Sequence, residues 1–352
     1  KEDNEETGGG FYRVEDTGRK TKNDDSLYGY ASATIFSSLM NLDVSHLFQS
    51  LFMEGGKNFY CYNGATPLSS SIFSVKYMLS DSALEESPYR TLVGGSGKSF
   101  LYRNNFSLPL GFVMDEQAIA DWNSSTAERM ASLNSFASAL GAEGQMLYPA
   151  TYVTDTNAGD TTIDVAEDGY YYADYESCTS DTLTVNRSDG WTKQYSKTSH
   201  RYLIELGECK AGDEIHILNS NMESIEFEVY QLNEKVVQQA FDTLNAQTMQ
   251  LTDMTDRKIE GKIQVQNAGR LILSVPADEG WTLYVDGKET EIEPLADALV
   301  GVHLEKGSHT IKLCYTTPGV KVGAGISLGA VVLFMISACV STRIRRKREL
   351  HE

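Results

Sequence analysis

Residues 320–342 of this 352-residue chain read VKVGAGISLGAVVLFMISACVST, with no charged side chain after Lys321. An apolar run of about twenty residues can span a lipid bilayer as one helix, and a soluble helix is rarely apolar on all sides for this length. The run is followed by five cations: Arg343, Arg345, Arg346, Lys347 and Arg348. Basic residues mark the cytoplasmic end of a membrane helix. The sequence therefore predicts a transmembrane helix at 320–342, a cytoplasmic basic tail at 343–352, and an extracytoplasmic location for residues 1–319.

The remainder of the chain is acidic. The net charge is −19, although the tail is basic. An acidic surface is repelled by the phosphates of a nucleic acid, so we expect no nucleic-acid partner.

Residues 1–10 (KEDNEETGGG) are polar and glycine-rich, which predicts a disordered linker without the apolar segment of a signal peptide. An extracytoplasmic location requires export. We therefore expect either a signal that has been removed or a membrane segment upstream of Lys1.

The patterning predicts an α+β fold: a small N-terminal α/β unit, then jelly-roll-like β-sandwich domains, ending in one transmembrane helix. Residues 11–146 form the α/β domain with a helical segment at 115–140, residues 147–232 a β-sandwich, and residues 233–319 a helix plus a second β-sandwich. Two hairpin turns are expected in the last domain, at Asp286-Gly287 and at Lys306-Gly307.

Local signals place elements within the first domain. FYRVE (11–15) alternates like a strand, and Asn41 is expected to cap a helix that ends at Gly55-Gly56. Residues 71–80 are predicted to form one buried strand, and residues 98–114 two more.

The sequence contains no recognisable catalytic motif. GGSGKS (94–99) lacks the earlier glycine of a phosphate-binding loop, since position 92 is leucine, and it precedes a strand pattern rather than a helix. It is therefore interpreted as a hairpin turn. Histidine and cysteine spacings predict no metal site, and no cofactor is expected.

Cysteines and tyrosines leave alternatives open. Cys178 and Cys209 could form a disulfide outside the cell, or remain as buried thiols. Tyr170-Tyr171-Tyr172 lies on a predicted strand, so alternate rings face opposite sides. Tyr171 is a candidate for stacking on a sugar ring, and filling of the core is the alternative.

Several stretches, taken in order, resemble a known family: FYRVE (11–15), NDDSLYGYASATIFSS (23–38), SVKYMLS (74–80), LYRNNFSLPLGFVM (101–114), GWTLYVDGKETEIEP (280–294) and LEKGSHTIKLCYTTPGVKVG (304–323). The chain is similar to the C-terminal extracytoplasmic region and last membrane helix of the YfhO family of bacterial membrane proteins. The resemblance implies a polytopic protein with a GT-C-like glycosyltransferase fold, which uses polyprenyl-phosphate sugars to glycosylate cell-surface polymers such as lipoteichoic acid.

The resemblance also implies partners and roles. The partners are the lipid bilayer, an N-terminal transmembrane bundle of the same protein, a cell-surface glycopolymer and a polyprenyl-phosphate sugar. The presumed catalytic acid of the family belongs to that bundle, so no catalytic residue is assigned here and the isolated chain is expected to be inactive. This part would position the acceptor. Candidate binding residues in the family-like N-terminal pattern are Tyr12, Arg13, Tyr28, Ser37 and Ser38.

Structural roles are the alternative for these residues. Arg13 pairs with either a phosphate or Glu15, and the others face the catalytic mouth or hold the first domain together. For the whole chain, the alternative is a single-pass surface protein whose β-sandwiches bind carbohydrate or a protein partner without catalysis.

Overall fold

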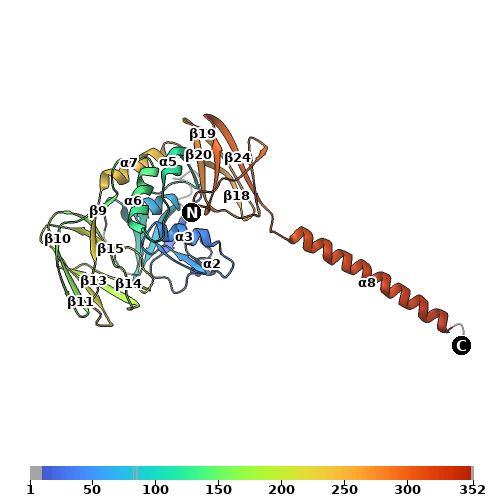
Figure 1. The fold of residues 1–352 in the computed structure, drawn as a ribbon, viewed down its shortest axis with the longest axis horizontal. Coiled ribbons are helices and arrows are strands. Elements are labelled where there is room, and N and C mark those ends of the chain that lie inside the picture. The colour runs from blue at the N-terminus through green and yellow to red at the C-terminus, as the bar shows by residue number, and fades with distance from the viewer. Residues whose placement is uncertain (1–9, 82, 85, 350–352) are drawn as a thin grey trace.

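A computed structural model describes residues 10–81, 83–84 and 86–349 of the chain. Several β-sheets and a few helices form the folded part, and a single long helix projects from it (Figure 1). The expected α+β class, with its sandwich sheets and one C-terminal apolar helix, is confirmed. The linker predicted at residues 1–10 lies outside the described residues except for Gly10.

The N-terminal unit contains a four-stranded and a three-stranded sheet. The first has the order β1 (Arg13–Asp16), β5 (Val75–Ser80), β7 (Ser99–Asn104), β6 (Arg90–Ser96). The second has the order β2 (Ile35–Phe36), β4 (Phe59–Cys61), β3 (Glu54–Gly56). Strand β1 runs parallel to β5, and the GGSGKS stretch forms the expected turn between β6 and β7. Gly97 has a φ of +63° there, a conformation that glycine adopts without strain.

Helices cover this unit and fill the space beside it. They are α2 (Asp24–Tyr28), α3 (Leu42–Ser50), α4 (Pro67–Ile72), α5 (Glu116–Asp121), α6 (Arg129–Ala139) and α7 (Glu234–Asn245). The Asn41 side chain accepts a hydrogen bond from Asp43 N at 2.8 Å and caps α3 as expected. One core joins α3, α4, α6 and α7, with Phe48, Leu68 and Phe136 fully buried in it.

The middle of the chain forms the predicted β-sandwich. Its five-stranded sheet has the order β10 (Tyr152–Asn157), β11 (Asp160–Val165), β16 (Glu214–Asn219), β13 (Thr182–Arg187), β14 (Thr192–Ser196). Its four-stranded sheet has the order β15 (Ile204–Cys209), β12 (Gly169–Asp174), β17 (Glu228–Leu232), β9 (Leu147–Pro149). A core of its own lies between the two sheets.

The third set of sheets carries the C-terminal helix. One sheet has the order β18 (Gln250–Thr255), β19 (Lys258–Val265), β24 (Gly307–Tyr315), β21 (Trp281–Val285), β22 (Lys288–Thr290). The other has the order β23 (Leu299–Leu304), β20 (Gly269–Pro276), β8 (Gly111–Met114). Because β8 pairs with β20, a strand from the range expected to be the first domain completes a sheet of the last one.

Three local predictions are wrong. Residues 71–80 are not one strand: α4 ends at Ile72, Ser74 takes a φ of +54°, and β5 starts at Val75. Helix α3 ends at Ser50, before Gly55-Gly56, because Phe52 turns the chain with a φ of +63°. Lys306-Gly307 joins β23 to β24, which belong to different sheets, so this turn is a crossover and not a hairpin. The Asp286-Gly287 hairpin is confirmed, with φ values of +53° and +80°.

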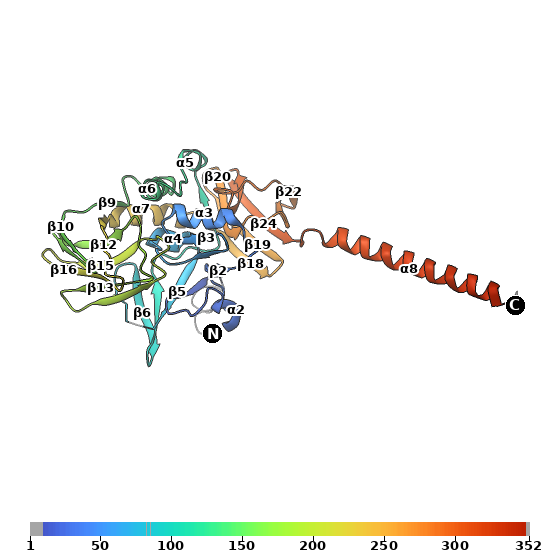
Figure 2. The same ribbon diagram turned by 60° about the horizontal axis from the view of Figure 1, so that its bottom comes forward.

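Helix α8 (Val320–Glu349) begins after Gly319 and continues through the basic residues that follow the apolar run. Its segment Val322–Arg346 is long and apolar enough to cross a membrane, and none of it is buried against the rest of the protein. Figures 1 and 2 show it extending away from the folded part. A helix with every apolar side chain exposed is stable in lipid rather than water.

Candidate functional site: a polar cavity between the N-terminal unit and the sandwich

A cavity of about 120 Å³ lies where the N-terminal unit meets the sandwich. Its walls come from the loop 62–65, the start of α4, β6, β12, β14 and β15. Six tyrosines line it: Tyr62, Tyr89, Tyr170, Tyr172, Tyr195 and Tyr202. Pockets for drug-sized ligands are typically roughly 300–1,000 Å³, so this cavity is suited to one small ring or to a few waters.

Local sequence explains how β12 supplies the cavity. Successive side chains of a strand point to opposite faces, so Tyr170 and Tyr172 share one face and Tyr171 occupies the other. Tyr170 and Tyr172 face the cavity, with ring centroids 5.6 Å apart, whereas Tyr171 packs in the sandwich core. The alternation expected from the sequence is thus confirmed.

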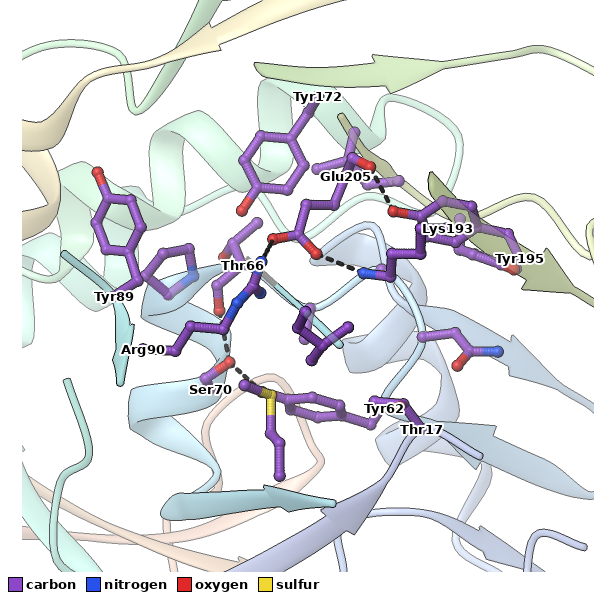
Figure 3. Close-up of a pocket in the computed structure, with 18 of the residues that line it drawn as sticks. Thr17, Tyr62, Thr66, Ser70, Tyr89, Arg90, Tyr172, Lys193, Tyr195 and Glu205 are labelled. Atoms are coloured by element: carbon purple, nitrogen blue, oxygen red, sulfur yellow. Dashed lines mark hydrogen bonds and ion pairs between the residues drawn. The ribbon is translucent and has the colours of Figure 1, made fainter. Parts of the chain in front are cut away.

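A carboxylate between two cations crosses the cavity (Figure 3). Glu205 Oε1 lies 2.6 Å from an Arg90 guanidinium nitrogen, and Glu205 Oε2 lies 2.6 Å from Lys193 Nζ. These side chains remain 15%, 9% and 17% exposed, respectively, because the cavity borders them. Tyr170 donates a hydrogen bond to the same carboxylate, and Tyr195 donates one to the Glu205 carbonyl oxygen. The three charged side chains therefore hold β6, β14 and β15 together.

Electrostatics fix the protonation states in this cluster. Burial would raise the pKa of Glu205, but the charges of Arg90 and Lys193 outweigh burial and hold that pKa well below its usual range. Burial raises the pKa values of Tyr170, Tyr172 and Tyr195 well above 10. At neutral pH the cavity thus presents one ionised carboxylate and neutral phenols, which suits binding better than proton transfer.

Hydroxyl groups complete the lining. The Tyr62 hydroxyl lies 2.6 Å from Ser70 Oγ on α4, and the Thr66 side chain caps that helix. In Figure 3 the Tyr172 hydroxyl points toward the Glu205 carboxylate, and it makes no hydrogen bond with any residue that the structure describes. Such a lining offers phenol edges, hydroxyls and amides to a small, neutral, hydroxyl-rich ligand.

A second polar cluster lies beside the cavity. It belongs to the same interface between the N-terminal unit and the sandwich, which is called the seam below. The buried Glu54 carboxylate lies 2.9 Å from Lys22 Nζ and 3.0 Å from His200 Nδ1, and it accepts a hydrogen bond from Asn63 at 2.8 Å. His200 belongs to the sandwich, and the other residues belong to the N-terminal unit. The cavity loop 62–65 is therefore anchored from both sides.

The residues expected to bind ligand do not gather at this cavity. Tyr12 packs edge-on against Tyr77, with ring centroids 5.3 Å apart. Arg13 donates to the carbonyl oxygens of Phe73 at 2.8 Å and Ser274 at 2.6 Å, which joins the first sheet to β20. The expected pair between Arg13 and Glu15 is not formed among the described residues, because the Glu15 carboxylate is bonded to Ser32, Ala33 and Thr34.

Tyr28, Ser37 and Ser38 lie on the surface around α2 and β2. Tyr28 is 65% exposed at the end of α2, and Ser38 is exposed in the loop after β2. Ser37 Oγ accepts a hydrogen bond from Leu39 N at 3.1 Å. None of these three residues lines the cavity.

For Tyr171, the structure supports filling of the core and not stacking on a sugar ring. Its side chain is fully buried in the sandwich core and donates a hydrogen bond to the Glu167 carbonyl oxygen at 2.7 Å. Tyr171 does not line the cavity, whereas its neighbours Tyr170 and Tyr172 do.

Sequence reasoning missed Arg90, Lys193 and Glu205. Arg90 on β6 is far along the chain from Lys193 on β14 and Glu205 on β15, and no spacing rule joins the three residues. The tyrosine triplet was the one usable signal, because strand alternation requires two of its rings to face away from Tyr171. The cysteines left open by the sequence are thiols here: Cys178 donates to Ser180 O and Cys209 to Gly207 O. Among the described residues, no group of three or more His, Cys, Asp or Glu side chains is placed to hold a metal ion.

Fold and site together define a β-rich membrane protein with a small polar cavity between two of its folded parts. The family model described as "Bacterial membrane protein YfhO" matches residues 1–327. The chain belongs to the YfhO family of bacterial membrane proteins, as the ordered resemblance indicated.

Individual proteins match this chain over shorter stretches or with low structural similarity. The YfhO protein of Bacillus subtilis (strain 168), described as uncharacterized, is 35% identical over 78 residues, which make up 22% of this chain and 8% of that protein. A β-galacturonidase from Eisenbergiella tayi bound to galacturonate covers 50% of this chain and 39% of its own, with 8% identity and a TM-score of 0.19. The match to a cupin-barrel protein from Leptotrichia buccalis covers 48% of this chain and 91% of that protein, with 12% identity and a TM-score of 0.12. Scores this low support no argument about function.

Proposed function

We propose that this chain is the extracytoplasmic part of a polytopic, GT-C-like membrane glycosyltransferase, and that it positions the acceptor polymer. Membership of the YfhO family and the membrane-spanning α8 support a place beside the membrane. The basic residues after α8's apolar run favour a cytoplasmic C-terminus, which leaves residues 1–319 outside.

One observation carries the acceptor-binding role: the tyrosine-lined cavity at the seam. A sugar unit presents hydroxyls at its rim and C–H groups on its faces. The cavity offers matching groups, with the Tyr172 hydroxyl and the Glu205 carboxylate for the hydroxyls and the Tyr170 and Tyr172 rings for the faces. Because Glu205 stays ionised and the phenols stay neutral, these residues bind and orient.

The reaction itself would take place in the transmembrane bundle. The donor, a polyprenyl-phosphate sugar, reaches the enzyme from the membrane plane, and the transmembrane bundle supplies the catalytic acid. The acceptor is a cell-surface glycopolymer such as lipoteichoic acid. The cavity would hold one unit of it, so that the next position of the polymer faces the bundle. Holding the acceptor in this way lowers the entropic cost of the transfer step.

The test uses the full-length protein in its host. The gene is deleted and then complemented with wild type, Tyr172→Phe or Tyr171→Phe, and sugar substitution on purified teichoic acids is measured by NMR. Tyr172→Phe removes a hydroxyl at the cavity, whereas Tyr171→Phe removes one in the sandwich core. At equal protein levels we expect substitution to fall in the deletion and in Tyr172→Phe, and to be restored by Tyr171→Phe.

Two results would argue against the proposal. Unchanged substitution in the deletion strain would remove this polymer as the product. Normal substitution by Tyr172→Phe, with loss of substitution in the deletion, would keep the enzyme but move acceptor binding away from the cavity. Sugar binding by the purified chain without any change in cellular glycosylation would instead favour a surface protein that binds carbohydrate without catalysis.

A further inference from the structure

Exposed apolar side chains are concentrated in one short part of the folded region. Outside α8, ten large apolar side chains of the described residues are exposed, and five of them lie within residues 27–42. These five are Leu27 (74%), Tyr28 (65%), Phe36 (46%), Leu39 (95%) and Leu42 (46%), and they are called the α2–α3 surface below. Five large exposed apolar side chains so close together in the chain point to a segment that contacts protein or membrane.

Hydrogen bonds hold this surface in shape. The Asn23 side chain donates to Phe36 O at 2.9 Å and accepts from Phe36 N at 2.8 Å, which fixes α2 against β2. Ser37 Oγ fixes the amide of Leu39 at the tip of the loop. The apolar side chains are thus presented by an ordered backbone and do not collapse onto the core.

The surface is also tied to the part of the chain that enters the membrane. Asn41, which precedes α3, donates a hydrogen bond to Ala277 O at 2.8 Å, just after β20. The unit that contains β20 also contains β24, and only residues 316–319 separate β24 from α8. In Figures 1 and 2, α2 lies in the half of the folded part nearer α8, whereas β10 and β13 lie at the opposite end.

We propose that the α2–α3 surface rests in the interface of the bilayer that α8 crosses. Helix α8, whose segment Val322–Arg346 is apolar enough to cross a membrane, leaves the folded part at this end, so the bilayer lies on this side of the molecule. Leucine and tyrosine side chains suit this position, since leucine enters the acyl region and tyrosine keeps its hydroxyl among the headgroups. The Asp24 carboxylate does not oppose insertion, because it is turned inward to Thr21 and the amide of Lys20.

A consequence is that the folded part is held against the membrane at two points, α8 and the α2–α3 surface. The connection at residues 316–319 contains Pro318 and Gly319, and one anchor would leave rotation about it free. Two anchors restrict that rotation and fix the face that the folded part turns to the membrane.

The test reconstitutes the whole chain in phosphatidylcholine nanodiscs and labels single cysteines with the fluorophore NBD. Cys314→Ser and Cys339→Ser form the background, and the remaining cysteines are buried. Leu39→Cys and Leu27→Cys probe the surface, and Val153→Cys on β10, 69% exposed, is the distal control. All three sites are exposed, so the substitutions leave the core intact.

We expect the labels at 39 and 27 to emit at shorter wavelength than the label at 153, and nitroxide groups on the lipid acyl chains to quench only the first two. Water-like, unquenched emission at 39 and 27 would overturn the proposal. Blue-shifted emission that lipid nitroxides do not quench would also overturn it, because a second copy or another protein segment would then cover the surface.

Discussion

Glu205 provides the sharpest test of how the seam is held together. Replacing Glu205 with glutamine preserves the size of the side chain and one oxygen for the Tyr170 hydroxyl. It removes the negative charge that faces Arg90 and Lys193, both at 2.6 Å. The Arg90 side chain is only 9% exposed, so its charge loses its nearby counter-charge in a poorly hydrated place.

The size of the effect follows from that burial. Breaking a buried ion pair by removing one partner costs about 3–5 kcal/mol. Because the Glu205 side chain keeps 15% exposure and the cavity admits water, we expect the lower end, about 3 kcal/mol. Glu208→Gln is the matched control on the same strand: its side chain is 43% exposed and 3.5 Å from Lys210, so its loss should cost less than about 1 kcal/mol.

The assay is urea unfolding of the whole chain in detergent micelles, followed by the fluorescence of its three tryptophans. The pH dependence supplies a second readout. The folded-state pKa of Glu205 lies below its ordinary value of 4.5, so its stabilisation is complete above that pH and is lost as the pH falls through the folded-state pKa. The difference in free energy of unfolding between wild type and Glu205→Gln should therefore become smaller at acid pH. If the two glutamine variants are equally stable at pH 7, the triad does not hold the seam.

Two further changes test the backbone around the seam. Gly64→Ala should destabilise the protein by more than about 1 kcal/mol relative to Gly212→Ala. Both glycines have similar positive φ values (+84° and +87°), but a Cβ at 64 would lie 2.5 Å from Phe52 O, whereas one at 212 meets nothing within 4 Å. Equal unfolding midpoints of the two variants would contradict this. Asn41→Ala should cost about 1–2 kcal/mol in the same unfolding assay, because it removes both the α3 cap and the hydrogen bond to Ala277 O. The control is Asn233→Ala, which removes only the cap bond of α7, 3.4 Å long. If Asn41→Ala costs no more than this control, the hydrogen bond to Ala277 O contributes nothing.

The sequence alone was sufficient for features that depend on near neighbours along the chain. The apolar run at 320–342 identified α8, because crossing lipid requires consecutive apolar residues and nothing from elsewhere in the fold. The φ values of Asp286 and Gly287 follow from two adjacent residues, and the opposite facing of Tyr171 and Tyr172 follows from the period of a strand. The family could likewise be recognised from ordered local stretches.

Tertiary structure alone decided which distant segments meet. Strand β8 pairs with β20, and Lys306-Gly307 crosses between sheets, because partner choice depends on how whole sheets bury their faces. The same reason explains the site: Arg90 of the N-terminal unit meets the sandwich pair Lys193 and Glu205 only when that unit packs on the sandwich. Periodicity records which face of an element is apolar, but it carries no information on what packs against that face, and the cavity exists only in that packing.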